Sequence, residues 1–375
     1  MDETAPRYTV YKMDISYFSG KLEAYLRNKG IAYVAQDADV RTLDRIHRAT
    51  GAKKVPAVEM ADGRWLFDTT PMLDWFEQQH PEPALTPTDP ALAFVAALVE
   101  DYADEWLWRP AMWWRWEPIP TRLALGWRIA QIVDFPAVHN GVFARYFAHR
   151  QRQTWLRDDG VNAGNAEAVR AVYLHELDTL QTVLSQQPYL LGARPSAADF
   201  GYFASMFRHF GNDPDPAEHM RRRAPAVYEW LARLWNGGPA RLGGEARWQW
   251  PEAPHWAGLW QRIAKDYLPY LHANACAYRD GRKRFDVACA AFALKGTVTH
   301  RYRVWCRQAL QRRFAALDVD AQSRVEALFA AHGGLQALHA DGVIDAGMED
   351  HFVLPKVAGD FRPSLRVALM GQPRD

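Results

Sequence analysis

The first part of the chain alternates strand-like and helix-like patterns of apolar and polar residues. Residues 8–11 alternate as in a strand, and residues 16–26 follow with the periodicity of a helix. A second strand is predicted at residues 32–35, and the apolar runs 57–58 and 65–67 predict two more strands on either side of a turn. This order predicts an α/β domain built around a sheet.

A proline enters the third predicted strand, and an acid and a hydroxyl open the helix after the hairpin. Val55-Pro56 is expected at an edge or bend, where a cis bond would present the Val55 backbone to an extended peptide. Asp62-Gly63 is a strong hairpin turn signal. Asp68 and Thr69 offer a carboxylate, a hydroxyl and backbone N–H groups at a helix N-terminus, which favours a ligand carboxylate, while Asp68 would attract a free amino group. These features predict a site for a small peptide.

At these residues the chain resembles the glutathione transferase superfamily. Its thioredoxin-like N-terminal domain carries a valine–proline pair before the third strand and a Glu/Gln–Ser pair at the next helix, and Val55-Pro56 and Asp68-Thr69 occupy those places here. The resemblance implies that Val55, Pro56, Asp68 and Thr69 bind glutathione as a co-substrate. It also implies an α/β thioredoxin-like domain followed by an all-α glutathione-transferase-type domain, in a protein that forms a homodimer.

The resemblance places the group that activates the glutathione thiol at the N-terminus of the first helix, where Ser16 and Tyr17 fall. A hydroxyl there can donate to the ligand sulfur, and the helix N-terminus adds a field that favours a thiolate. Ser16 is the first candidate, with helix capping as the alternative role. Tyr17 is the second and Tyr11 the third, with core packing as their alternative role.

Cysteine usage and charge restrict the classes of function. Cys276, Cys289 and Cys306 lie far from the first helix, which argues against thiol exchange there, and their odd number and wide spacing favour reduced thiols in a cytoplasm. The 45 basic and 44 acidic side chains leave a net charge of +1, so no nucleic acid or anionic membrane is expected as a partner. The N-terminus does not resemble a signal peptide, and no apolar run approaches the ~20 residues of a spanning helix.

The proline-rich segment 80–90 separates the α/β pattern from a long helical one. Ser196 and Asp199 form a predicted capping box before an apolar helix, and the segment leading to it also resembles the helical domain of the superfamily. We therefore predict three units: residues 1–82 as the thioredoxin-like glutathione-binding domain, residues 91–237 as the all-helical C-terminal domain, and residues 245–375 as a mainly helical C-terminal extension.

Tryptophans are concentrated at the start of the helical domain, in residues 106–116. Aromatic walls with a few polar groups suit an apolar or aromatic ligand, so Trp106, Arg109 and Trp113 are candidates for a substrate pocket, with core packing as the alternative. The acidic residues just before them, between 100 and 105, are expected on a surface face that nearby arginines neutralise, with Asp101 or Asp104 as a partner of the glutathione amine as the alternative.

The resemblance to the glutathione transferase superfamily does not cover the C-terminal extension. Residues 256–273, 301–317 and 321–332 are expected to be helical, and residues 365–369 are expected to form a strand. The extension would cover the active site, complete a subunit interface or form a docking unit. His272 and Cys276 share a helical face, and His300 lies near Cys306 in the sequence, but a zinc site needs further ligands in a closed geometry, so no metal is expected.

Two classes of function remain open. The first is a cytoplasmic glutathione S-transferase-type enzyme, implied by the resemblance, that directs the thiolate to a hydrophobic or aromatic electrophile by addition, substitution or isomerisation. The second is a non-catalytic protein of the same fold that acts through protein contacts. Residues 16–27 also resemble the metaxin and failed-axon-connections branch of the superfamily, in which transferase activity is not the defining role.

Overall fold

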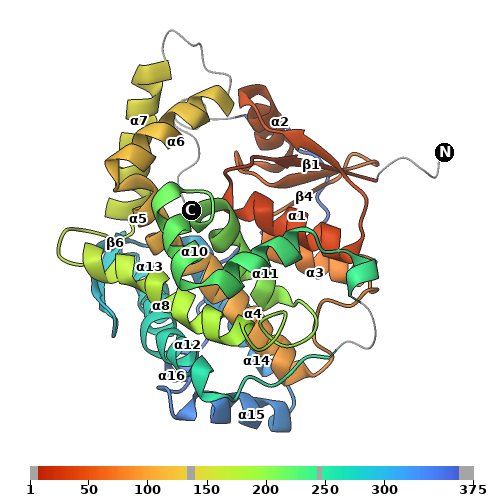
Figure 1. Cartoon of the computed structure of the whole chain (residues 1–375), viewed down its shortest axis with the longest axis vertical. Coiled ribbons are helices and arrows are strands. Elements are labelled where there is room, and N and C mark those ends of the chain that lie inside the picture. Colours follow the sequence, from red (N-terminus) through yellow and green to blue (C-terminus); the bar gives the residue numbers. More distant parts are fainter. Residues whose placement is uncertain (1–6, 133–139, 243–246, 363–375) are drawn as a thin grey trace.

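The computed structural model describes residues 7–132, 140–242 and 247–362. Its N-terminal part is a four-stranded sheet in the order β2-β1-β3-β4, in which β1 pairs in parallel with β2 and antiparallel with β3. The strands are β1 (Tyr8–Lys12), β2 (Val34–Asp37), β3 (Ala57–Met60) and β4 (Trp65–Phe67). The helices are α1 (Tyr17–Lys29), α2 (Val40–Thr50) and α3 (Thr69–Gln79). Figure 1 shows α2 on one face of the sheet and α1 with α3 on the other, so the thioredoxin-like arrangement is confirmed.

Alternate side chains of the strands bury against the two helical layers. Val10, Val58 and Leu66 join the core beneath α1 and α3, whereas Tyr11 and Trp65 pack with α2. This alternation follows from the two-residue period of a strand. The predicted hairpin turn is confirmed as well. Gly63 in this turn has φ +82°, a backbone conformation that would be strained in a residue with a side chain.

The second part is helical, as predicted. It contains α4 (Pro90–Glu105), α5 (Trp108–Trp116), α6 (Ile119–Ile132), α7 (Asn140–Arg152), α8 (Ala166–Leu184), α9 (Ala197–Ser205), α10 (Pro214–Arg223) and α11 (Pro225–Trp235). The capping box is present, since the Asp199 carboxylate accepts from the Ser196 N–H at 3.0 Å. Asp199 also accepts from the backbone N–H of Leu190 at 2.9 Å, so one acid fixes both the start of α9 and the loop before it.

The extension is mainly helical but contains a strand pair that the sequence analysis missed. The helices are α12 (Ala257–Arg262), α13 (Leu268–Arg279), α14 (Arg301–Ala315), α15 (Val319–Ala330) and α16 (Gln336–His339), and the hairpin is β5 (Arg284–Ala288) with β6 (Ala293–Val298). The apolar residues Phe285 and Val287 do alternate with polar or small ones in β5, but the pattern covers only five residues, and β6 has the single large aliphatic residue Leu294 before Gly296, so the signal is short. The strand predicted at residues 365–369 lies outside the described residues.

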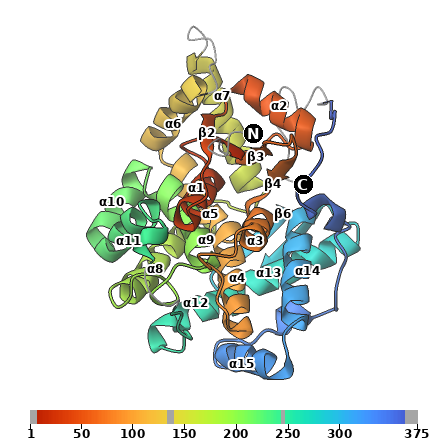
Figure 2. The same cartoon turned by 90° about the vertical axis from the view of Figure 1, so that its right-hand side faces the viewer.

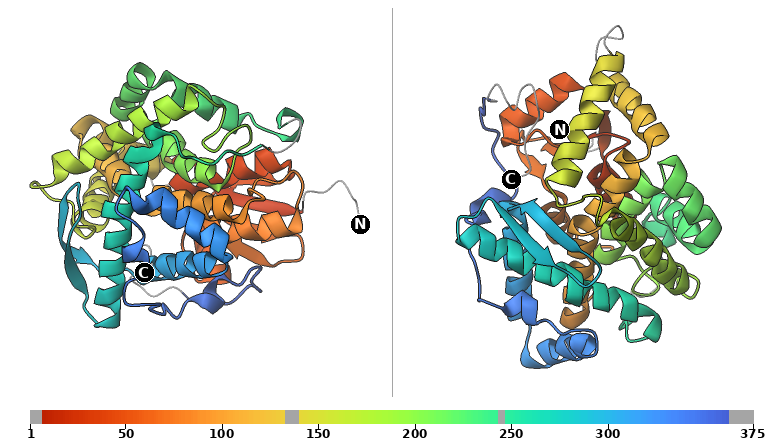
Figure 3. Two further views of the ribbon diagram at one scale, coloured as in Figure 1. Left: turned by 90° about the horizontal axis from the view of Figure 1, so that it is seen from below. Right: turned by 90° about the vertical axis from the view of Figure 1, so that its left-hand side faces the viewer.

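The extension packs against both preceding parts. Figure 2 and the left view of Figure 3 show its blue helices beside the orange helix α4, and the rings of Phe94 on α4 and Phe314 on α14 meet edge to face at 5.4 Å. Arg324 on α15 is 2.8 Å from the carboxylate of Asp89, the residue that caps α4. Further on, the backbone of Lys356 exchanges two hydrogen bonds of 2.8 Å with that of Trp65 in β4. The extension therefore reaches the sheet itself.

Candidate functional site

Ser16 lies where the first helix and the proline-bearing strand meet. Its hydroxyl accepts a hydrogen bond of 3.3 Å from the Ser19 N–H as the N-cap of α1, and it is 3.5 Å from the carbonyl oxygen of Val55. The Val55-Pro56 peptide bond is cis, the conformation considered in the sequence analysis. The structure thus brings Ser16 and the Val55-Pro56 pair together. The capping role of Ser16 is confirmed, whereas its role in catalysis stays a prediction.

Asp68 stands at the entrance to α3 in an unusual backbone conformation, with φ +66°. Its side chain forms no cap hydrogen bond; instead, its Oδ1 accepts from the Tyr302 hydroxyl of the extension at 3.2 Å. Burial raises the pKa of Asp68 to about 6, although nearby Lys54 and Lys21 act to lower it. Among the described residues no cation lies within ion-pair distance of this carboxylate. The neighbouring Thr69 is buried, with 5% of its surface exposed.

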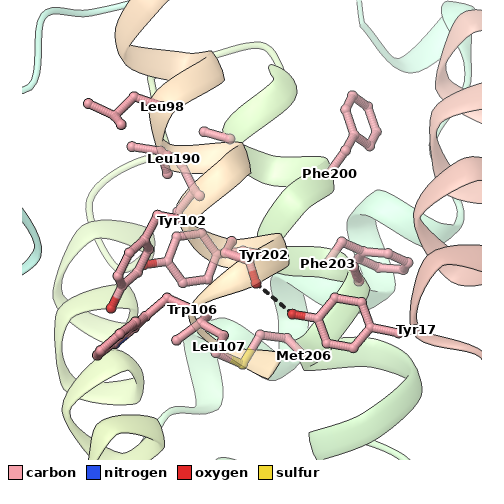
Figure 4. Packing of buried hydrophobic residues seen from close by; sticks show 14 of the residues in the cluster. Tyr17, Leu98, Tyr102, Trp106, Leu107, Leu190, Phe200, Tyr202, Phe203 and Met206 are labelled. Carbon is pink, nitrogen blue, oxygen red and sulfur yellow. Dashed lines mark hydrogen bonds between the residues drawn. The ribbon is translucent and has the colours of Figure 1, made fainter. Parts of the chain in front are cut away.

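The two tyrosine candidates are engaged elsewhere. Tyr17 is 2% exposed and donates its hydroxyl to the backbone carbonyl of Ala103 at 2.6 Å, and Figure 4 shows that hydroxyl pointing into the apolar cluster. Tyr11 lies on the other face of the sheet, where it donates to Glu59 at 2.6 Å and stacks on Trp65. Burial and the Glu59 bond raise the pKa of Tyr11 to about 12. Both tyrosines have the packing role that was considered as their alternative.

Two of the three residues predicted for a substrate pocket lie in the core. Trp106 is 1% exposed, and its ring stacks on Phe292 of the extension at 5.4 Å. Arg109 has no exposed surface, and its guanidinium pairs with Asp159 at 2.9 Å. Trp113 is half-buried and packs at the margin of the cluster. The structure brings Trp106 and Arg109 into contact with each other but not into an open pocket.

The acidic segment of α4 is buried, not the surface face that we expected. Lys21 of α1 has no exposed surface, and its ammonium lies 2.5 Å from Glu100 and also pairs with Asp104. Burial acts to lower the pKa of Lys21, but the two carboxylates outweigh it and raise that pKa above its usual value. Glu100 and Asp104 share this one lysine of the first domain, and burial raises the pKa of Asp104 well above its usual value. The three side chains hold α1 against α4.

A second buried ionic cluster joins the extension to the helical domain. Arg303 of α14 is 1% exposed and lies 2.8 Å from Glu105 and 2.6 Å from Asp159, the acid that also holds Arg109. Charges removed from water are tolerated only when they are paired and hydrogen-bonded, and here the partners come from three separate segments. This cluster fixes the first turn of α14, and with it Tyr302, beside the peptide-site candidates.

Two cavities lie at the interface between the extension and the rest of the chain. One of about 350 Å³ lies between α3, α4 and α14, and one of about 270 Å³ lies beside it, with Asp74 and Arg313 lining both. Asp101 lines the larger cavity, and burial raises the pKa of Asp101 to about 7. Ser16 and Asp68 line neither cavity.

Tyr302 is the site residue that sequence reasoning missed. It lies 234 positions from Asp68 in a segment outside the resemblance, so no local pattern or motif could have found it. Burial together with the Asp68 charge raises the pKa of Tyr302 well above its usual value, so it is a hydrogen-bond donor at neutral pH.

Comparison with known proteins agrees with the two-part organisation. The family model described as glutathione S-transferase, N-terminal domain, matches residues 10–84, and that of the glutathione S-transferase C-terminal domain matches residues 163–233. No curated protein matches the chain. Among the described helices, none is long and apolar enough to cross a membrane.

Several solved structures are similar. A glutathione S-transferase from Rhodospirillum rubrum F11 is 16% identical with a TM-score of 0.42, over 61% of this chain and 90% of that one. The beta-etherase LigF from Sphingobium sp. strain SYK-6 is 20% identical with a TM-score of 0.43, over 63% and 97%. A glutathione S-transferase from Methylobacterium radiotolerans JCM 2831, in complex with glutathione sulfonate, is 16% identical with a TM-score of 0.39, over 66% and 99%.

The structural likeness is too distant to add to the assignment, which rests on the two family matches. They follow one another in the order that the fold shows, one on the sheet and one on the helices around α8 and α9. By these two matches, the chain carries an N-terminal and a C-terminal domain of the glutathione S-transferase family, at residues 10–84 and 163–233.

Proposed function

We propose that this protein is a glutathione S-transferase-type enzyme that binds glutathione as a co-substrate and activates its thiol with Ser16. The observation that carries the proposal is the approach of the Ser16 hydroxyl to the Val55 carbonyl oxygen, at 3.5 Å. An extended ligand whose backbone pairs with Val55 would then lie beside the first turn of α1. A thiolate there would receive a hydrogen bond from Ser16 and the favourable field of the helix N-terminus.

Asp68 supports the choice of a peptide with a free amino group. Asp68 is partly buried and has no ion pair, so it would gain from a cationic ligand, because an ammonium group offsets the cost of removing the carboxylate from water. The remaining acceptor positions of Asp68 suit such a group, and the Thr69 end of α3 suits the ligand carboxylate. Because the pKa of Asp68 is about 6, we expect affinity for glutathione to increase as the pH rises through that value.

The second substrate is an apolar or aromatic electrophile in this proposal. Trp113 is the sequence candidate that is only partly buried, whereas the contacts of Trp106 and Arg109 favour a packing role. Addition, substitution and isomerisation all begin from the same thiolate, so all three reactions are retained. We also retain a cytoplasmic homodimer, with the three cysteines as free thiols.

A non-catalytic protein of this fold is the second candidate, and one observation favours it. Tyr302 already occupies an acceptor position of Asp68, and Lys356 pairs with the strand that leads to Asp68. A segment of the same chain therefore lies where a ligand amino group would arrive. In this alternative the extension closes the peptide site permanently, and the fold serves protein contacts, as the likeness of residues 16–27 to the metaxin branch suggests.

Calorimetric titration of the full chain with reduced glutathione separates the two candidates. The enzyme predicts saturable binding that Asp68→Ala weakens, while Asp62→Ala, a change at an exposed acid of the same hairpin, leaves it intact. The non-catalytic alternative predicts no binding at millimolar glutathione. A gain of binding in Tyr302→Phe, from none in the natural sequence, would show that the extension blocks an otherwise competent site.

A further inference from the structure

His272, Cys276 and Asp341 form a cluster in the extension, away from the residues proposed for glutathione. His272 and Cys276 are one turn apart on α13, with the thiol sulfur 3.3 Å from His272 Nε2. Asp341 follows α16, and its Oδ2 is 2.8 Å from the same nitrogen and 3.6 Å from the sulfur. Imidazole, thiol and carboxylate are the three donor types that proteins use to bind zinc.

The separations fit one face of a tetrahedral site. With Zn–S of about 2.3 Å and Zn–N and Zn–O of about 2.0 to 2.2 Å, ligand atoms in a tetrahedron lie about 3.4 to 3.6 Å apart. The sulfur is 3.3 Å from the nitrogen and 3.6 Å from the oxygen, close to those values. The nitrogen and oxygen are nearer, at 2.8 Å, because a hydrogen bond joins them. If a cation took the place of the proton in this hydrogen bond, the nitrogen and the oxygen would need to move apart by only about 0.6 Å.

Side chains of α14 hold the loop that carries Asp341 in place. Arg307 of α14 is 1% exposed and donates to the carbonyl oxygens of Gly342 at 3.1 Å and Ala340 at 2.5 Å. Gln311, one turn later, donates to the Gly342 carbonyl at 3.0 Å. Outer contacts of this kind orient the ligands of metal sites. The position of Asp341 is therefore set before any cation arrives.

Asp341 also has a backbone conformation that needs an explanation. Within the described residues, Asp68 and Asp341 are the two non-glycine residues with positive φ, and Asp341 has φ +57°. Such conformations persist where the surroundings impose them, and they are concentrated at functional sites. Here the left-handed turn directs the carboxylate toward α13, while Arg279 lies 3.3 Å from its other oxygen, Oδ1. Oδ2 is then the oxygen presented to Nε2 and Sγ.

We propose that His272, Cys276 and Asp341 form a three-ligand site for a thiophilic divalent cation of the zinc type. The mixed sulfur, nitrogen and oxygen set selects such a cation over magnesium or calcium, which prefer oxygen ligands alone. His272 and Asp341 are partly exposed, at 27% and 45%, so a cation has an entry path and a fourth position open to water. This proposal departs from the expectation of no metal, because the fold brings Asp341 to His272 and Cys276 as a third ligand that the sequence could not place.

Titration of the metal-stripped full chain with Co²⁺ tests the site directly, because a thiolate ligand gives a charge-transfer band in the near ultraviolet that oxygen and nitrogen ligands do not give. We expect one Co²⁺ per chain with this band, and its displacement by Zn²⁺. Cys276→Ser should abolish the band. Cys289→Ser, which changes the other half-buried cysteine, should leave it intact.

Asp341→Asn supplies an independent test at an exposed position where folding is not at risk. It should weaken Zn²⁺ binding by more than the roughly 10-fold to 100-fold that the loss of an outer-shell partner costs. Zn²⁺ should also raise the Tm of the natural sequence but not that of Cys276→Ser, because a bound cation stabilises the folded state alone. Absence of the band, or equal Zn²⁺ affinity in the natural sequence and Cys276→Ser, would overturn the proposal.

Discussion

Asp68→Asn should make the protein more stable and a poorer binder of glutathione. The substitution keeps the shape of the side chain and an oxygen that accepts from Tyr302, but it removes the charge. Burial raises the pKa of Asp68 from an ordinary value of 3.8 to about 6. A difference of this size corresponds to about 3 kcal/mol against the ionised carboxylate in the folded state.

The direction in which stability changes with pH depends on whether the folded or the unfolded state binds the Asp68 proton more tightly. The folded protein retains the Asp68 proton to a higher pH than the unfolded chain does, so its stabilising contribution is complete below about pH 4 and is lost as the pH rises through about 6. Asparagine does not titrate. The difference in unfolding free energy between Asp68→Asn and the natural sequence should therefore grow in favour of the variant between pH 4 and pH 7, by up to about 3 kcal/mol.

Urea denaturation of both proteins at a series of pH values from about 4.5 to 7.5 measures this difference, and subtraction cancels the titration of all other groups. Asp62→Asn is the matched control. Its hydrogen bonds with Arg64 lower the pKa of Asp62 below its ordinary value of 3.8, so this carboxylate is ionised in both the folded and the unfolded state, and the difference for Asp62→Asn should stay nearly constant over this pH range. A difference for Asp68→Asn that does not change with pH would refute the account of a partly buried carboxylate without an ion pair.

Glutathione affinity should change in the opposite direction. Loss of one charge-assisted hydrogen bond costs roughly 1.5 to 3 kcal/mol, so Asp68→Asn should bind glutathione about 10-fold to 150-fold more weakly at neutral pH. Higher stability with weaker binding is typical of a residue retained for function. If Asp68→Asn were more stable but bound glutathione with unchanged affinity, Asp68 would not be part of the ligand site.

Three further predictions follow from the same contacts. Ser16→Ala should lose glutathione-dependent turnover while it keeps its affinity, and the loss of the cap should cost about 1 kcal/mol of stability; Asp39→Ala, which removes the cap of α2, should cost a similar amount without loss of turnover. Arg303→Ala should lower the unfolding free energy by about 3 to 5 kcal/mol, seen as a lower Tm, because it leaves Glu105 and Asp159 buried without this partner; a change below about 1 kcal/mol would contradict that. Light scattering should give about twice the chain mass of 42.8 kDa, and a value near a single chain would exclude the expected homodimer.

Features set by neighbouring residues could be predicted from the sequence. The cap at Ser16, the turn at Asp62-Gly63 and the capping box at Ser196 each depend on a few adjacent positions, and all three are present. Together with the alternation of apolar residues, the first two located the peptide-site candidates and most elements of the first domain, although β2 begins at Val34 and not at residue 32. The roles of the candidates depend on ligand contacts, so those roles stay predictions.

Features set by distant partners could not be predicted. The acids of α4 resemble a solvated face when they are read alone, and only the fold brings Lys21 to Glu100 and Asp104. The contact between Tyr302 and Asp68 spans 234 positions, and no periodicity encodes it. The domain boundary predicted after residue 237 likewise stays a prediction, because a single hydrophobic cluster extends from the first strand to α16.

The backbone pairing of Lys356 with Trp65 has a consequence for the behaviour of shortened chains. Without the extension, the backbone N–H and C=O of Trp65 at the edge of the sheet would lose their partners, and α4 would expose Phe94. Open strand edges and apolar patches are templates for aggregation. We therefore expect a fragment that ends at residue 237 to self-associate during expression, so that the extension protects the protein from aggregation, whatever else it does.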